Sequence, residues 1–177
     1  MEHYVAFLRG INVSGQKLIK MDALRKVLTE SGFTDVKTYI QSGNLLFNAE
    51  DQDTNHLILT IESLIEKHFG FHTDVILRKK IEIETVLKSM ESFRLKSDEG
   101  RKYYITFAKE EFPVQIEVPL FSKNQDVEII FHNSKDFISV STEFKGNFGF
   151  PNSFIEKLTG IPATTRNPNT LGKILNL

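Results

Sequence analysis

The 177-residue sequence predicts an α+β fold, in which a first unit with alternating strands and helices packs against a smaller second α+β unit. Three observations carry this prediction. Apolar residues recur at three- and four-residue spacing in two segments of the first half, which indicates amphipathic helices. Short apolar or alternating runs lie between and around them, which indicates strands. Finally, 40% of the residues are hydrophobic and 25% are charged, as in a protein with a core.

Ordinary start and stop signals bound the elements of the first half. We expect a strand at 4–8, a helix at 21–31 ended by Gly32, strands at 36–40 and 44–47 joined by a tight turn, a helix at 53–68 ended by Gly70, and a strand at 73–77. The resulting order, strand–helix–strand–strand–helix–strand, is that of the split βαβ or ferredoxin-like fold.

The second half is less regular. Its polar stretch at 96–100 is the expected boundary, so the predicted units are residues 1–95 and 96–177. After these six elements we expect helices at 82–90, 152–158 and 171–175, strands at 102–107, 127–132 and 137–142, and a loop at 163–170. The first strand is apolar on both faces, which predicts that helices cover one face of its sheet and the second unit the other.

Composition excludes several classes of protein. The sequence has no cysteine, which rules out disulfides, thiol catalysis and cysteine-ligated metal sites. It has no apolar run of about 20 residues and no basic leader, so we expect a cytoplasmic protein that does not enter membranes. His68 and His72 are four residues apart, but the glycine between them breaks the helix that would align them. We therefore expect no metal and no cofactor.

Three polar stretches do not fit simple packing: residues 9–17 (RGINVSGQK), 38–44 (TYIQSGN) and 163–167 (ATTRN). With their neighbouring residues they resemble the bacterial family called domain of unknown function 1697, whose opening signature is arginine-glycine-isoleucine-asparagine-valine-glycine-glycine. The resemblance implies a ferredoxin-like unit followed by a second α+β unit, and it implies no particular activity. Two positions depart from the family pattern. Ser14 replaces a glycine, a mild change if its backbone is ordinary, and Pro168 replaces a tryptophan that would offer a stacking surface.

The first and third stretches favour an anion-binding function. Residues 9–20 and 157–177 each contain three bases and no acid, although the whole chain has a net charge of −1. The first segment also leads into a helix, whose N-terminus attracts anions. The candidate ligand-binding residues are Arg9, Asn12, Lys17, Lys20, Arg166 and Asn167. The alternative is a solvated loop, with Arg9 paired to a carboxylate and Arg166 holding the last helix by an ion pair.

The middle stretch contains the turn at 41–44, which we interpret as structural, because Ser, Gly and Asn supply tight turns. We expect it at the opposite end of the sheet from the loop that begins at Arg9, so that the two do not form one site.

The sequence therefore predicts a cytoplasmic module that binds a phosphorylated small molecule, a nucleotide or a nucleic acid. The alternative is a structural or protein-interaction module with no small-molecule ligand. Whether the protein is an enzyme stays open. The three stretches contain no His, Asp, Glu or Cys, which weighs against ordinary hydrolytic or redox chemistry. We expect single alanine variants of all five histidines to keep whatever activity exists.

Overall fold

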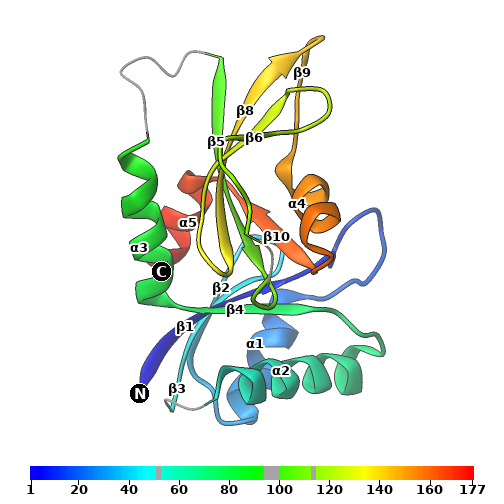
Figure 1. The fold of residues 1–177 in the computed structure, drawn as a ribbon. Helices are drawn as coiled ribbons and strands as arrows, with labels where there is room; N and C mark the ends of the chain where they lie inside the picture. The colour runs from blue at the N-terminus through cyan, green and yellow to red at the C-terminus, as the bar shows by residue number, and fades with distance from the viewer. Residues whose placement is uncertain (51–52, 94–99, 113–114) are drawn as a thin grey trace. The chain divides into compact units, whose positions relative to one another are not determined.

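The computed structural model describes residues 1–50, 53–93, 100–112 and 115–177 (Figure 1). The chain forms two compact units. The first comprises Met1–Ile83 together with Gly172–Leu177, and the second comprises Glu84–Leu171. The polar boundary expected at 96–100 lies outside the described residues except for Gly100. The division into domains 1–95 and 96–177 stays a prediction.

The first unit has the expected ferredoxin-like order. Its elements are β1 (Glu2–Leu8), α1 (Met21–Glu30), β2 (Thr34–Tyr39), β3 (Asn44–Ala49), α2 (Thr54–Phe69) and β4 (Val75–Lys79). The four strands form one sheet in the order β2-β3-β1-β4, and each neighbouring pair is antiparallel. The α+β class is thereby confirmed. Since β3 lies between them and runs against both, β1 and β2 point in the same direction.

Local signals place the helix ends as the sequence predicts. The carboxylate of Asp53 accepts a hydrogen bond from the backbone N–H of Asn55 at 3.1 Å and so caps the start of α2. Gly70 ends this helix in a left-handed conformation, with φ of 78°. The fourth strand begins at Val75, two residues later than expected, because residues 72–74 form a loop that is hydrogen-bonded to Arg9.

The core of the first unit lies between its sheet and its two helices. Phe47 is fully buried, and its ring stacks on Tyr4 at 5.8 Å and meets Phe33 edge-on at 5.1 Å between ring centroids. Both faces of β1 are buried, since no side chain from Tyr4 to Leu8 is more than 1% exposed. The other buried residues of this core include Leu24, Leu28, Leu57, Ile61, Ile65 and Leu77.

A C-terminal segment belongs to the first unit as well. The Lys37 ammonium donates to the backbone carbonyl of Leu177 at 2.8 Å, and the Lys80 ammonium donates to the carbonyl of Leu175 at 2.7 Å. Lys80 begins α3 (Lys80–Glu91), which follows β4 directly. These contacts attach the end of α5 (Pro168–Leu175) to the first unit.

The second unit is built on an antiparallel sheet in the order β10-β5-β8-β7-β6, and β9 pairs with β8. Its strands are β5 (Arg101–Ala108), β6 (Leu120–Phe121), β7 (Val127–His132), β8 (Asp136–Phe144), β9 (Asn147–Phe148) and β10 (Ala163–Arg166). The helix α4 (Pro151–Thr159) contributes Ile155 to a core with Ile129 and Phe137.

The expectation of a loop at 163–170 is wrong. Its first four residues form β10, which pairs with β5 so that Thr165 lies opposite Thr106, and its last three residues belong to α5. The run is short and flanked by Pro, Asn and Gly, so its local pattern is that of a loop. Hydrogen bonds to β5 make it an edge strand, and such pairing is not visible in local sequence.

Every helix in the described part of the chain is too short or too polar to cross a membrane.

Candidate functional site

Three loops of the first unit meet at one edge of its sheet. They are residues 9–20 after β1, residues 40–43 between β2 and β3, and residues 70–74 before β4; together we call them the three-loop edge. Pairing of the strands brings them together, because Phe7 lies opposite Asn44 on one side of β1 and Leu8 lies opposite Val75 on the other. The end of β1 is thus next to the starts of both β3 and β4.

The expectation that the turn at 41–44 lies far from the Arg9 loop is wrong. In this fold β1 and β2 run in the same direction, so the turn that follows β2 lies at the end of β1 and not at its start. Gly43 shows how close the two are. Its carbonyl accepts from the backbone N–H of Leu8 at 2.8 Å, and an added Cβ would lie 2.8 Å from Cβ of Leu8 and 2.9 Å from Cδ1 of Ile11.

The loop after β1 folds back on itself as a miniature hairpin. The backbone N–H of Gln16 donates to the carbonyl of Val13 at 3.0 Å, and Ser14 and Gly15 at its tip have φ of 51° and 74°. Positive φ at both central residues is the requirement of a type I′ turn. Ser14 therefore does not have an ordinary backbone conformation: it lies in the left-handed region, where a side chain costs conformational energy.

Asn12 joins this hairpin to the rest of the three-loop edge. Its own φ is 54°. The side-chain amide donates to the carbonyls of Ile19 at 3.0 Å and Gln41 at 2.7 Å, while its oxygen accepts from the N–H of Ile19 at 2.8 Å. The amide thus connects both ends of its own loop and the turn between β2 and β3. The candidate residue Asn12 has a clear positioning role in the structure.

A groove of about 760 Å³ opens between this loop, the turn and the start of α1. Its volume is in the range of small-molecule sites. Lys20 is exposed and forms the N-cap of α1, but no side chain caps the helix there. The N–H groups of the first helical turn have no carbonyl partner inside a helix. The groove is lined by Asn12, Leu18, Ile19, Lys20, Met21, Asp22, Ala23 and Gln41.

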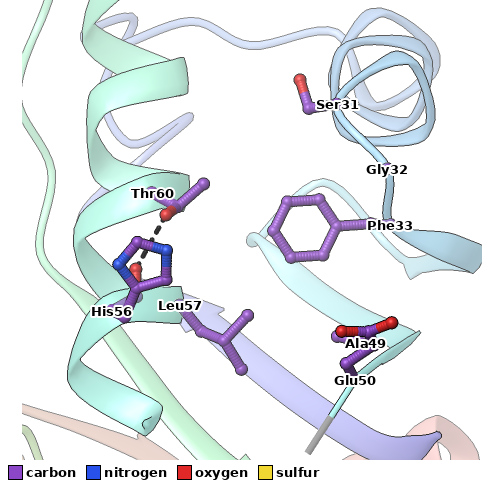
Figure 2. A pocket seen from close by; sticks show the side chains of 8 residues that line it. All are labelled: Ser31, Gly32, Phe33, Ala49, Glu50, His56, Leu57 and Thr60. Atoms are coloured by element: carbon purple, nitrogen blue, oxygen red, sulfur yellow. Dashed lines mark hydrogen bonds between the residues drawn. The ribbon is translucent and has the colours of Figure 1, made fainter. Parts of the chain in front are cut away.

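A second pocket, of about 260 Å³, has a different character (Figure 2). It lies between the end of α1, the end of β3 and the first turns of α2. The ring of Phe33 and the side chain of Leu57 line it beside His56 and Glu50. No Lys or Arg is among its described lining residues. The groove at α1 is therefore the better place for an anion.

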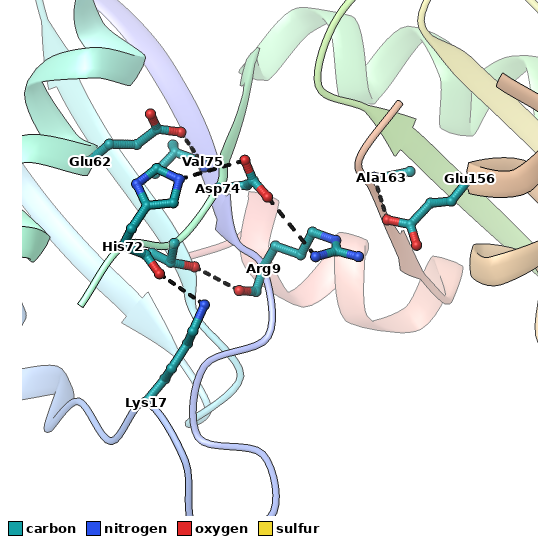
Figure 3. A network of polar contacts seen from close by, with 9 residues as sticks. Arg9, Lys17, Glu62, His72, Asp74, Val75, Glu156 and Ala163 are labelled. Carbon is teal, nitrogen blue, oxygen red and sulfur yellow. Dashed lines mark hydrogen bonds and ion pairs between the residues drawn. The ribbon is translucent and has the colours of Figure 1, made fainter. Parts of the chain in front are cut away.

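A polar network holds residues 70–74 against the end of β1 (Figure 3). The backbone N–H of Arg9 donates to the carbonyl of Asp74 at 2.9 Å, and the hydroxyl of Thr73 donates to the carbonyl of Arg9 at 2.6 Å. Nη1 of Arg9 also lies 3.9 Å from Oδ2 of Asp74. Arg9 is therefore paired to a carboxylate, as the alternative interpretation expects. Nζ of Lys17 donates to the carbonyl of His72 at 2.8 Å.

Two candidate residues lie in the second unit. Arg166, in β10, donates from Nη1 to the hydroxyl of Thr164 at 2.7 Å and to the carbonyl of Thr165 at 2.9 Å. Burial lowers the pKa of Arg166 to about 10, so the guanidinium is still charged at neutral pH. The side-chain oxygen of Asn167 accepts from the N–H of Thr170 at 2.8 Å and caps the start of α5.

Sequence reasoning missed Glu62 and Asp74 of this region, and it considered His72 only together with His68. His72 and Asp74 lie next to Arg9 and Lys17, and Glu62 of α2 reaches the same place, where its Oε1 accepts from the N–H of Val75 at 2.9 Å. Only the order of the strands in the sheet could have indicated these residues. In a ferredoxin-like sheet the start of the fourth strand lies beside the end of the first, which places residues 72–74 beside Arg9.

Comparison with known proteins agrees with the fold. One solved structure, "the structure of conserved bacterial protein SP0830 from Streptococcus pneumoniae", is similar over 99% of this chain and 97% of its own, with a TM-score of 0.67 and 24% sequence identity. At that identity the likeness concerns the fold alone. A search of curated proteins gives no significant match.

The sequence also matches the family described as "Protein of unknown function (DUF1697)" over residues 1–136. This range includes the whole three-loop edge, and it ends before Arg166 and Asn167. The family resemblance is thereby confirmed: the chain belongs to the DUF1697 family of proteins of unknown function.

Proposed function

We propose that this chain binds an anionic, phosphate-bearing ligand in the groove at the start of α1. The ligand class includes phosphorylated small molecules, nucleotides and nucleic acid. The observation that carries the proposal is the lining of the groove, in which an exposed lysine, Lys20, stands at a helix N-terminus that no side chain caps. The N–H groups there and the lysine ammonium all favour negative charge.

Asp22, the one acid among the described residues that line the groove, is already partly compensated. Asp22 lies in the first turn of α1, where a carboxylate competes with an anionic ligand for the helix N-terminus. The guanidinium of Arg25 forms an ion pair with it one turn further along the helix. Arg25 also donates to the hydroxyl of Thr38 at 2.5 Å, which holds the guanidinium against β2. Lys20 therefore remains the charged group best placed to meet an anion.

The conformation of the loop supports a binding role. Five residues between positions 10 and 17 have positive φ, and three of them are not glycine: Asn12, Ser14 and Lys17. Such a conformation costs energy and persists only where surrounding contacts hold it, which is common in ligand-binding loops. Here the hydrogen bonds from the Asn12 side chain to Ile19 and Gln41, and the hydrogen bond from Lys17 to the carbonyl of His72, supply those contacts.

The candidate residues take different roles in this proposal. Lys20 contacts the ligand, and Asn12 and Lys17 hold the loop in its binding conformation. Arg9 adds positive charge to the same edge. Ligand contacts by Arg166 and Asn167 stay predictions, as do a cytoplasmic location and a bacterial source.

A thermal-shift titration tests the proposal directly. Pyrophosphate, AMP and a short single-stranded DNA are added in large excess to the full chain at low and high salt. We expect at least one probe to raise Tm, because a ligand that binds only the native state stabilises it. The rise should shrink as salt increases, since screening and counterion release weaken contacts to phosphates.

Two lysine variants of α1 show whether the groove is responsible. Lys20→Ala should abolish most of the rise in Tm, because it removes the ammonium from the groove. Lys26→Ala is the matched control, since Lys26 is exposed on the same helix, lies outside the groove lining and pairs with Glu30 at 3.8 Å. Arg166→Ala tests the remaining basic candidate. If no probe raises Tm, or if both lysine variants respond like the parent chain, the proposal is wrong and the structural-module alternative is favoured.

A further inference from the structure

Glu62, His72 and Asp74 form a cluster of side chains that the groove does not use. Each offers one ligand atom, and these three atoms all lie within 4.8 Å of one another. The residues come from two elements, since Glu62 lies in α2 and the other two in the loop before β4. His72 and Asp74 are two residues apart, and Nε2 of His72 lies 3.9 Å from Oδ1 of Asp74 (Figure 3).

We propose that this cluster is a binding site for a divalent metal ion, with Zn²⁺ as the ion that its donors fit best. One imidazole and two carboxylates are a donor set that zinc accepts. The two carboxylates attract the ion, the guanidinium of Arg9 offsets part of their charge, and imidazole favours zinc over magnesium or calcium. Three protein ligands leave at least one coordination position open to water or to another ligand. This inference does not depend on anion binding in the groove at α1.

The three ligand atoms need to move only a short distance toward one another to bind one ion. Two ligands bound to a tetrahedral zinc ion lie about 3.4 Å apart. The His72–Asp74 pair must therefore close by about half an ångström, and no pair by more than about 1.4 Å. The side chain of His72 is 57% exposed, so its ring is free to turn toward the two carboxylates. Glu62 is 7% exposed and the Asp74 side chain is 24% exposed, so the two carboxylates are more deeply placed than the imidazole.

Neighbouring groups orient both carboxylates, as partners of metal ligands generally do. Oε1 of Glu62 accepts from the N–H of Val75 at 2.9 Å. Asp74 directs Oδ2 toward Arg9 and Oδ1 toward His72. The same carboxylate can thus keep its ion pair with Arg9 and bind a metal through its other oxygen.

The backbone of the loop that carries two of the ligands is fixed on both sides. Thr73, between them, is buried, and its hydroxyl donates to the carbonyl of Arg9. The carbonyl of His72 accepts from Nζ of Lys17. His72 and Asp74 are therefore presented together toward Glu62 without a change in the fold.

Calorimetric titration of the untagged full chain with ZnCl₂, after treatment with a chelator, tests the site in a buffer without phosphate. We expect one Zn²⁺ per chain. Titration with Co²⁺ should give visible absorption bands that excess Zn²⁺ removes, because the two ions compete for the same ligands. Since no phosphate is present, failure here leaves the anion-binding test untouched.

His72→Ala is the decisive variant, because His72 is exposed and its loss should not disturb folding. We expect it to weaken Zn²⁺ binding by at least about tenfold and to abolish the Co²⁺ bands. Asp74→Asn should act in the same direction. The control is His68→Ala, which removes an exposed histidine of α2 outside the cluster and should leave binding unchanged.

Three results would overturn the proposal. The first is the absence of any heat of Zn²⁺ binding by the parent chain. The second is equal loss of affinity in His72→Ala and His68→Ala, which would indicate binding by surface histidines in general. The third is unchanged affinity in both His72→Ala and Asp74→Asn while circular dichroism shows them folded.

Discussion

The side-chain amide of Asn12 donates to the backbone carbonyl of Gln41 at 2.7 Å, across 29 residues of sequence. Both residues also line the groove at the start of α1. One side chain therefore sets the distance between the two loops that form the walls of this groove. The shape of the groove depends on a hydrogen bond, and substitutions at Asn12 should affect it without removing any charge.

Asn12→Ala should destabilise the protein by about 1–3 kcal/mol. The substitution leaves the amide and carbonyl of Ile19 and the carbonyl of Gln41 without their partner, and alanine tolerates positive φ less well than asparagine. Urea unfolding followed by circular dichroism measures the change. The control is Asn55→Ala at an exposed position of α2, where we expect a change within about 0.5 kcal/mol.

Gly43→Ala should be more harmful than Gly10→Ala. Both glycines have positive φ, 75° and 69°, so each substitution costs about 1 kcal/mol in backbone conformation. At Gly43 the new methyl group would also lie 2.8 Å from Cβ of Leu8, whereas at Gly10 nothing lies within 4 Å. Thermal unfolding of the two variants compares them. Equal values of Tm would contradict the close approach of the turn to β1.

Ser14→Gly should stabilise the protein by about 0.4–1 kcal/mol. Ser14 occupies the left-handed region at the tip of the miniature hairpin, where glycine has no steric penalty. The greater freedom of glycine in the unfolded chain reduces the gain but does not cancel it. Differential scanning calorimetry should show a higher Tm. A lower one would mean that the hydroxyl of Ser14 makes a contact worth more than the strain.

Ser139→Ala should leave stability unchanged or raise it by up to about 1 kcal/mol. The Ser139 hydroxyl is buried in β8 and has no hydrogen-bond partner among the described residues, so its removal relieves a desolvation cost. The comparison is Thr165→Val, which removes a hydroxyl that lies 2.7 Å from that of Thr106 and 3.0 Å from Oδ1 of Asn152. We expect that variant to lose about 1–3 kcal/mol in the same urea titration.

Much of the first unit could be predicted from the sequence, because its signals are local. The helix stripe with Leu24 and Leu28 repeats at helical spacing, and Gly32 and Gly70 lie just after their helices. A buried stripe, a cap and a stop signal all act within a few residues. Local pattern was therefore enough to place α1, α2 and the order of strands.

The candidate site could be predicted only in part, because its geometry depends on pairing between strands. Arg9, Asn12 and Lys17 were found by composition and resemblance, but the position of Gln41 beside Asn12 follows from the direction of β2. The position of His72 beside Lys17 could not be predicted either, since the two residues are 55 positions apart in the chain. The same reason explains β10, which is a strand only because β5 lies beside it.

The three-loop edge is assembled from residues that are more than 60 positions apart in the chain, such as Arg9 and Thr73, whose hydrogen bond spans 64. Such non-local contacts require the long segments between them to be closed first. A ligand at this edge can therefore recognise only a first sheet in which β1, β3 and β4 are already paired. Its binding should slow amide hydrogen exchange in all three strands together. Slower exchange in β4 would then indicate ligand binding at the start of α1.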